Sequence, residues 1–187
     1  MRKSKINALL FTILVAASLS GETGFSISLS SLSGGTSNSS AGLGADFIWR
    51  SPLGDGPLYV GCNAGARLYG PSAQTTVSNL LIAAPVTVNL AVQPFSAPLK
   101  IRIGAGAGAY VSYLFFADGG TSLGLVPIVE PFIEIAVSLG NLDIVCIPSY
   151  TAIFDMIAPS GTYAQEITFR AGILFGTTPA ADARREQ

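Results

Sequence analysis

Nine charged residues between positions 43 and 175 fall, by parity, on one face of the predicted strands. They include both signs and occupy alternate positions opposite the apolar residues: Asp46, Arg50, Arg67, Lys100, Arg102, Glu130, Glu134, Glu166 and Arg170. A buried charge without a partner is costly, so carboxylates and guanidinium groups on a shared inner face are expected to pair. The pattern predicts a network of ion pairs that fills the interior as a polar plug. The alternative is a transport pathway through the interior.

Other chemistry is poorly supported by the composition. The chain has no histidine, which removes the usual serine-histidine catalysis and the commonest ligand for zinc, copper or iron. Its acidic residues do not follow the spacing of a calcium loop. Residues 104–108 (GAGAG) lie inside a predicted strand with no helix after them, so they do not form a dinucleotide loop. We therefore expect no enzyme, no cofactor and no metal.

The bulk composition limits the environment of the chain. Of its 187 residues, 49% are hydrophobic and only 11% are charged, whereas soluble domains carry about 25% charged residues. Something other than water must therefore cover much of the surface. The net charge of -1 gives no basic face, and we expect no nucleic-acid partner.

The first residues have the pattern of an export signal. Arg2, Lys3 and Lys5 precede a short apolar run at 8–17 (ALLFTILVAA), and small residues follow up to Gly21. The run is too short to span a bilayer as a helix, so we expect removal after about Ser20; an ordinary buried N-terminal helix is the alternative. The expected division is a cleavable signal at 1–20, a barrel at 21–176 and a short polar tail at 177–187.

The period that recurs after residue 21 is two, which indicates strands with unlike faces. It is clearest at 99–115, where Ile101 and Ile103 alternate with Lys100 and Arg102. At 142–154 the alternation fades after Asp143, so the facing of that segment is unsure. The candidate strands are 25–30, 43–50, 58–69, 86–92, 99–115, 129–139, 142–154 and 167–175.

The spacers between these segments alternate between short and long. Short ones with turn residues lie at 51–57, 94–98 and 140–141, and longer ones lie at 33–42, 70–79, 117–124 and 155–163. Because lipid leaves no other partner for backbone groups, the sheet must close. The predicted fold is an all-β, eight-stranded antiparallel up-and-down transmembrane barrel. A soluble sandwich or lipocalin-like barrel is the alternative, but its exposed face would be rich in charge.

In this architecture residues 24–175 resemble the small eight-stranded bacterial outer-membrane barrels of the OmpW, OmpX and OmpA-domain types. The resemblance implies an outer-membrane location after export, contact with the lipid bilayer and insertion by the barrel-assembly machinery. Such chains commonly end on an aromatic residue of the last strand, whereas this one continues past Phe175. Either Phe175 acts as an internal signal or assembly recognition differs.

Two functions remain open from the sequence. A narrow, porin-like pore or passage for small molecules is one; a non-conducting structural or surface-exposed adhesive barrel is the other. Inward-facing glycines mark bends or leave space, and the OmpW resemblance implies a cavity for a small apolar ligand. These lumen glycines are Gly61, Gly65, Gly104, Gly106 and Gly108.

The two cysteines invite a disulfide in an oxidising compartment. Cys62 and Cys146 fall on the third and seventh predicted strands, which stand on opposite walls of an eight-stranded ring. A disulfide needs Cα atoms within about 7 Å. We expect two free thiols.

Aromatic residues on the lipid-facing parity near strand ends predict an interface belt: Trp49 and Phe175 at one end, Tyr113 and Phe115 at the other. Trp49 is the one tryptophan, so its fluorescence reports on this belt. In vesicles we expect quenchers at the level of the lipid headgroups to reduce Trp49 emission more than quenchers in the middle of the acyl chains. An emission spectrum typical of tryptophan in water would contradict the placement.

Overall fold

The computed structural model describes residues 21–33, 39–70, 80–96, 98–154 and 163–176. The expected signal at 1–20 and the expected tail at 177–187 lie outside these residues. Among the described residues no helix is long and apolar enough to cross a membrane.

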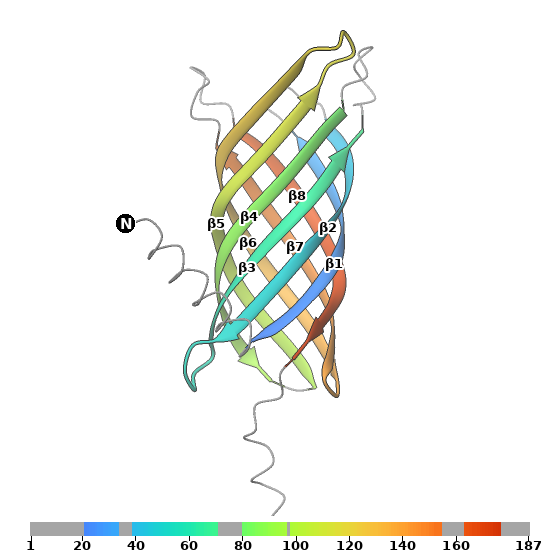
Figure 1. Cartoon of the computed structure of the whole chain (residues 1–187). Helices are drawn as coiled ribbons and strands as arrows, with labels where there is room; N and C mark the ends of the chain where they lie inside the picture. The colour runs from blue at the N-terminus through green and yellow to red at the C-terminus, as the bar shows by residue number, and fades with distance from the viewer. Residues whose placement is uncertain (1–20, 34–38, 71–79, 97, 155–162, 177–187) are drawn as a thin grey trace, which may run out of the picture.

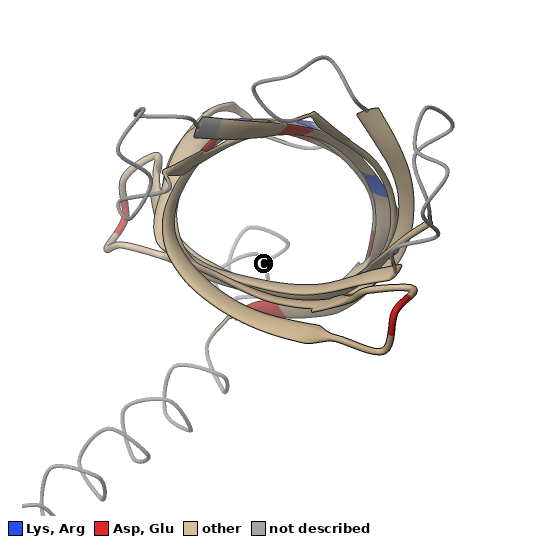
Figure 2. Cartoon of the chain, turned by 90° about the horizontal axis from the view of Figure 1, so that it is seen from above, with Lys and Arg blue, Asp and Glu red and all other residues tan. Residues whose placement is uncertain are grey.

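The described chain forms one closed antiparallel barrel in the order of the sequence, with β8 pairing back to β1 (Figures 1 and 2). This confirms the predicted fold class. The eight strands are β1 Glu22–Ser33, β2 Ser39–Pro52, β3 Leu58–Tyr69, β4 Leu80–Phe95, β5 Leu99–Phe115, β6 Thr121–Leu139, β7 Leu142–Phe154 and β8 Tyr163–Phe175.

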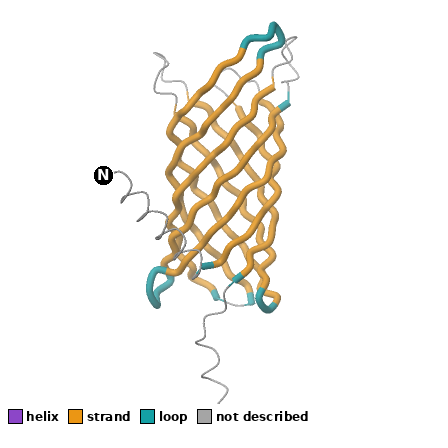
Figure 3. Tube along the Cα trace, viewed as in Figure 1, coloured by secondary structure: helices purple, strands orange, loops and turns teal. Residues whose placement is uncertain are grey.

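The two ends of the barrel differ in their connections (Figure 3). One end, here the turn end, holds the start of β1, the end of β8 and the short links β2–β3, β4–β5 and β6–β7. Gly54 and Gly140 take positive φ in two of these turns, at 67° and 70°, a conformation that costs glycine little. The other end, the loop end, holds the longer connections and the β5–β6 hairpin, which rises above the neighbouring strands (Figure 1).

Several strands are longer at the loop end than the alternation predicts. β2 begins at Ser39 and β6 at Thr121, so part of the predicted loops 33–42 and 117–124 belongs to strands. Serine, threonine and glycine give no hydrophobic alternation, but their backbone groups pair as well as any others. The strand pairing at this end is therefore invisible to a pattern of side chains.

The two faces of the wall separate as predicted: charged and polar side chains point inward, and apolar ones point outward. β7 also resolves its facing, with Asp143, Val145, Ile147, Ser149 and Thr151 buried inside. Val145, Ile147 and the likewise buried Ile153 are apolar, which explains why the alternation fades there. Ile147 joins an apolar layer inside the lumen with Ile48 and Phe132.

A charge on the outer face at mid-depth tests this orientation. Val88 lies near the centre of β4 with 63% of its surface exposed. Val88→Arg should lower the stability of the folded barrel in lipid vesicles by about 2 to 4 kcal/mol, because the guanidinium would face hydrocarbon. The measurement is urea unfolding in vesicles, with Val88→Leu as the matched control. Equal stability of the two variants would show that this wall does not contact lipid.

Candidate functional site in the barrel lumen

The structure places the charged residues of the sequence pattern inside the barrel. Eight of them are at most 2% exposed, and Lys100 keeps 21% of its side chain accessible. Glu22 and Asp143 also point inward. Sequence reasoning missed both, because Glu22 precedes the first alternating segment and Asp143 opens the segment whose facing was unclear.

The first group of charges, the turn-end cluster, consists of Glu22, Arg50, Lys100, Arg102, Glu134 and Asp143. Arg102 and Glu134 are direct neighbours in the β5–β6 register and form an ion pair. The second carboxylate oxygen of Glu134 accepts from Nε of Arg50 at 3.2 Å. Arg50 stands on β2 and Glu134 on β6, four strands away in the ring, so this pair crosses the full width of the lumen.

A second crossing completes the turn-end cluster. Glu22 on β1 accepts a hydrogen bond from Nζ of Lys100 at 3.2 Å and forms an ion pair with Nη2 of Arg102 at 2.6 Å. Both cations stand on β5, opposite β1. Lys100 also contacts Oδ2 of Asp143 at 2.6 Å. The cluster therefore ties β1, β2, β5, β6 and β7 together.

The second group, the central cluster, consists of Asp46, Arg67, Glu130, Glu166 and Arg170. Arg67 pairs with Glu166 and lies 3.3 Å from Oδ1 of Asp46. Nε of Arg170 lies 3.4 Å from the same oxygen of Asp46, and Arg170 also forms an ion pair with Glu130. Of the two inward carboxylates on β6, Arg170 thus pairs with Glu130, whereas Glu134 belongs to the turn-end cluster.

Hydroxyl groups add hydrogen bonds to two of the central carboxylates, Glu130 and Glu166. The hydroxyl of Ser149 donates a hydrogen bond to Glu130 at 2.9 Å and accepts one from Nη1 of Arg170 at 3.0 Å. Thr168 donates to Glu166 at 2.5 Å. Hydrogen bonds to ionised groups are among the stronger ones, and a buried pair needs them to offset desolvation.

Apolar layers separate and cap the charges. Ile48 lies between Asp46 and Arg50 along β2, and Phe132 lies between Glu130 and Glu134 along β6. This layer explains why no ion pair joins the two clusters among the described residues. Phe132 also lies beneath the guanidinium of Arg50, 5.3 Å from its ring centre, in cation–π contact.

A second apolar layer lies nearer the loop end. It contains two tyrosines whose hydroxyl oxygens are 3.4 Å apart, Tyr69 and Tyr110, and both are almost completely buried. The other buried members are Ala83, Ile128 and Ile153. The inner volume is thus filled in layers along the barrel axis.

The lumen glycines lie opposite large side chains. Gly61 pairs in register with Arg50, and a Cβ at Gly61 would come within 2.8 Å of the Arg50 Cδ. Gly65 stands directly across from Asp46, and its missing side chain makes room for that carboxylate. The interior of an eight-stranded barrel is just wide enough for its own side chains. A long charged residue therefore needs a neighbouring residue that has no side chain.

Glycines on β5 also lie against groups that leave no room for a side chain. A Cβ at Gly106 would collide with the amide of Asn89, and one at Gly104 would come within 2.8 Å of the Phe132 ring. At Gly108 the neighbouring β4 backbone itself leaves no space. These glycines accommodate neighbouring groups, which argues against the apolar-ligand cavity that the sequence left open at these positions.

The outer wall carries the aromatic residues predicted for the interface. Tyr113 and Phe115 form an edge-to-face pair at the loop end with ring centres 4.6 Å apart, and Phe175 is exposed at the turn end. Trp49 lies on the outward parity of β2 and is half-buried. The structure adds Phe95 to the turn end.

The remaining candidate chemistry is limited. Cys62 and Cys146 are both free thiols, as expected from their strands. Within the described ranges no group of three or more histidine, cysteine, aspartate or glutamate side chains is arranged to hold a metal ion.

The sequence matches no protein-family model and no curated protein. Solved structures do match the fold. Neisserial surface protein A superposes with a TM-score of 0.62 at 12% identity, over 83% of this chain and 96% of that one. A major outer membrane protein from Thermus thermophilus gives a TM-score of 0.53 at 13% identity, over 82% and 98% of the two chains.

The attachment invasion locus protein of Yersinia pestis, Ail, gives a TM-score of 0.50 at 13% identity, over 83% of this chain and 99% of that one. These likenesses are to whole proteins of similar length, and identity this low shows the fold alone. The chain has the fold of the small bacterial outer-membrane β-barrels.

The trans-lumen pair of Arg50 and Glu134 generates a stability prediction. Glu134→Gln leaves Arg50 buried without its carboxylate, and we expect a loss of about 3 to 5 kcal/mol, reduced if water enters. Arg50→Gln in the same chain should recover part of that loss. A double-mutant cycle of urea unfolding in vesicles measures the coupling.

The matched control is Asp55→Asn, which removes a carboxylate from the exposed β2–β3 turn. It should leave stability nearly unchanged. Strictly additive effects of the Arg50 and Glu134 substitutions would mean that the two side chains do not interact across the lumen.

Proposed function

We propose that the protein is an integral outer-membrane barrel whose lumen is closed, so that it serves as a non-conducting scaffold anchored in the membrane. The single observation that carries this proposal is the set of ion pairs that cross the lumen between opposite walls. Arg50 with Glu134, and Glu22 with Lys100 and Arg102, join strands that stand four apart in the ring.

The burial of these groups supports closure. Arg102, Glu134 and Glu166 have no measurable exposed surface, and Arg50 has 1%. A water-filled passage beside these side chains would leave them accessible to water. Charges that line an open pore remain hydrated, whereas these are paired with one another.

Opening such a lumen would carry an energetic cost at each cluster. A solute that passes the turn-end cluster must displace Arg50 or Glu134 from its partner, which leaves a buried charge unpaired at about 3 to 5 kcal/mol. The apolar layer around Phe132 adds a second barrier to ions and polar solutes. The packing therefore favours the non-conducting scaffold over the narrow pore.

The membrane placement is supported by the exterior. Large apolar side chains on all eight strands are exposed, among them Ile27, Leu90 and Ile133. A soluble protein does not expose a continuous apolar band of this size, whereas lipid solvates it. The export signal proposed at 1–20 agrees with this location.

A surface role fits the closed scaffold. The β5–β6 hairpin rises beyond the rim and carries exposed Phe116, Leu123 and Leu125 (Figure 1). A barrel that conducts nothing can still hold such a hairpin at the cell surface.

Conductance of the refolded full chain tests the proposal. In planar bilayers the wild type should show no ion-conducting steps, because paired charges and apolar layers fill the lumen. The double variant Arg50→Ala, Glu134→Ala removes both long side chains of one crossing and should produce small conductance steps or solute leak.

Asp55→Asn serves as the control and should remain silent. Vesicle flotation and heat-modifiable gel migration verify that each variant is inserted and folded. Reproducible single-channel steps from the folded wild type would contradict closure and restore the pore hypothesis.

A further inference from the structure

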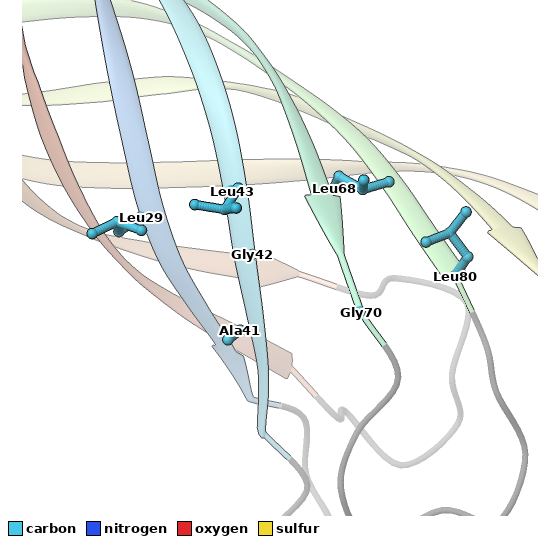
Figure 4. A pocket seen from close by; sticks show the side chains of 7 residues that line it. All are labelled: Leu29, Ala41, Gly42, Leu43, Leu68, Gly70 and Leu80. Atoms are coloured by element: carbon cyan, nitrogen blue, oxygen red, sulfur yellow. The ribbon is translucent and has the colours of Figure 1, made fainter.

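We propose that the outer wall near the loop end holds one acyl chain of an outer-leaflet lipid in a groove across β1 to β4. This inference rests on the proposed membrane placement. The groove is an open depression of about 390 Å³, and the side chains that line it are almost entirely apolar (Figure 4). It is bounded chiefly by Leu29, Leu43, Leu68, Leu80, Ala41 and Gly70.

Two small residues at neighbouring positions make the floor. Ala41 on β2 and Gly70 after β3 are adjacent, since the Gly70 N–H donates to the Ala41 carbonyl at 3.3 Å. Both lie on the outward parity and are exposed. A Cβ at Gly70 would meet nothing within 4 Å, so the missing side chain leaves open space.

Leucines form the walls of this depression. Leu29, Leu43 and Leu68 are consecutive partners in the β1–β2 and β2–β3 registers and make a row below the floor. Leu80 closes the side at the start of β4 (Figure 4). Two small residues bordered by four leucines therefore make a concave apolar site on the outer wall.

The surroundings specify a membrane lipid as the occupant. The groove is continuous with the apolar band below it, where Ile27 and Phe25 follow Leu29 along the same face of β1. Beside and above the floor the outward parity becomes polar: Ser31 pairs in register with Ala41, and Ser39 stands at the start of β2. Outer-membrane barrels place their longer loops outside the cell, so the loop end lies in the outer leaflet. A lipid of that leaflet meets this order, with its polar head at the serines and its chain against the leucines.

The test is lipid retention by the full chain. Wild-type and variant proteins are refolded into vesicles of dimyristoylphosphatidylcholine, extracted into detergent micelles and examined by native mass spectrometry. Ala41→Phe should fill the floor and lose the phospholipid that the wild type retains. Ala45→Phe makes the same change on the same face of β2 outside the groove, and it should retain the lipid as the wild type does.

Folding is verified by heat-modifiable migration, and insertion by vesicle flotation. If Ala41→Phe does not fold, Gly70→Leu fills the same floor from β3. Inserted variants that retain the lipid equally, or that lose it equally at positions 41 and 45, overturn the groove and leave the membrane proposal intact. Failure of the wild type itself to float with vesicles overturns both.

Discussion

A β-strand surrounded by hydrocarbon has no partner for its backbone N–H and C=O groups except another strand. In this protein that requirement is met by closing eight strands into a ring, with β8 returning to β1. Everything inside the ring follows from its size. Eight strands leave an interior that side chains can fill, so whatever points inward must pack against its neighbours and against the opposite wall.

The lumen satisfies this volume constraint with a simple complement of large and absent side chains. Arg50 faces Gly61, Asp46 faces Gly65, and Asn89 faces Gly106 in register. The glycines are therefore as much part of the ionic network as the charges. Replacing either residue of such a pair changes the side-chain volume in an interior that is already filled. The result is overpacking or a cavity, and either one lowers stability.

Ion pairs are not the source of most of the stability in such a fold. Taking charges out of water is expensive, and a buried pair is often no better than an apolar replacement of equal volume. In the proposed non-conducting scaffold, the contribution of the pairs is to close the lumen, and each pair that crosses it requires its two residues at the same height on opposite strands. Apolar layers around Phe132 and around Tyr69 confine each cluster to its own level.

Much of this protein was determined by its sequence alone. The period of two, maintained through 58–69 and 99–115, specifies both the strands and their faces. The reason is that the lipid outside the wall selects apolar side chains, whereas the interior selects polar and charged ones. This period therefore predicted the strand count and the inward position of charges such as Arg102 and Glu134. Local alternation has no such information where both faces are similar, so the loop-end extensions at Ser39 and Thr121 and the facing of β7 were not predictable.

The tertiary structure decided which charged residues pair with one another across the lumen. Arg50 and Glu134 are separated by 84 residues, and no spacing along the chain shows that β2 and β6 stand opposite each other at one height. That meeting depends on ring closure and register together, as does the separation of Glu130 from Glu134 into different clusters. The outer groove is likewise tertiary, since Ala41 and Gly70 become one floor only when β2 pairs with β3. On the strands with clear alternation, the sequence determined which residues face inward and outward; register and closure determined which of them meet.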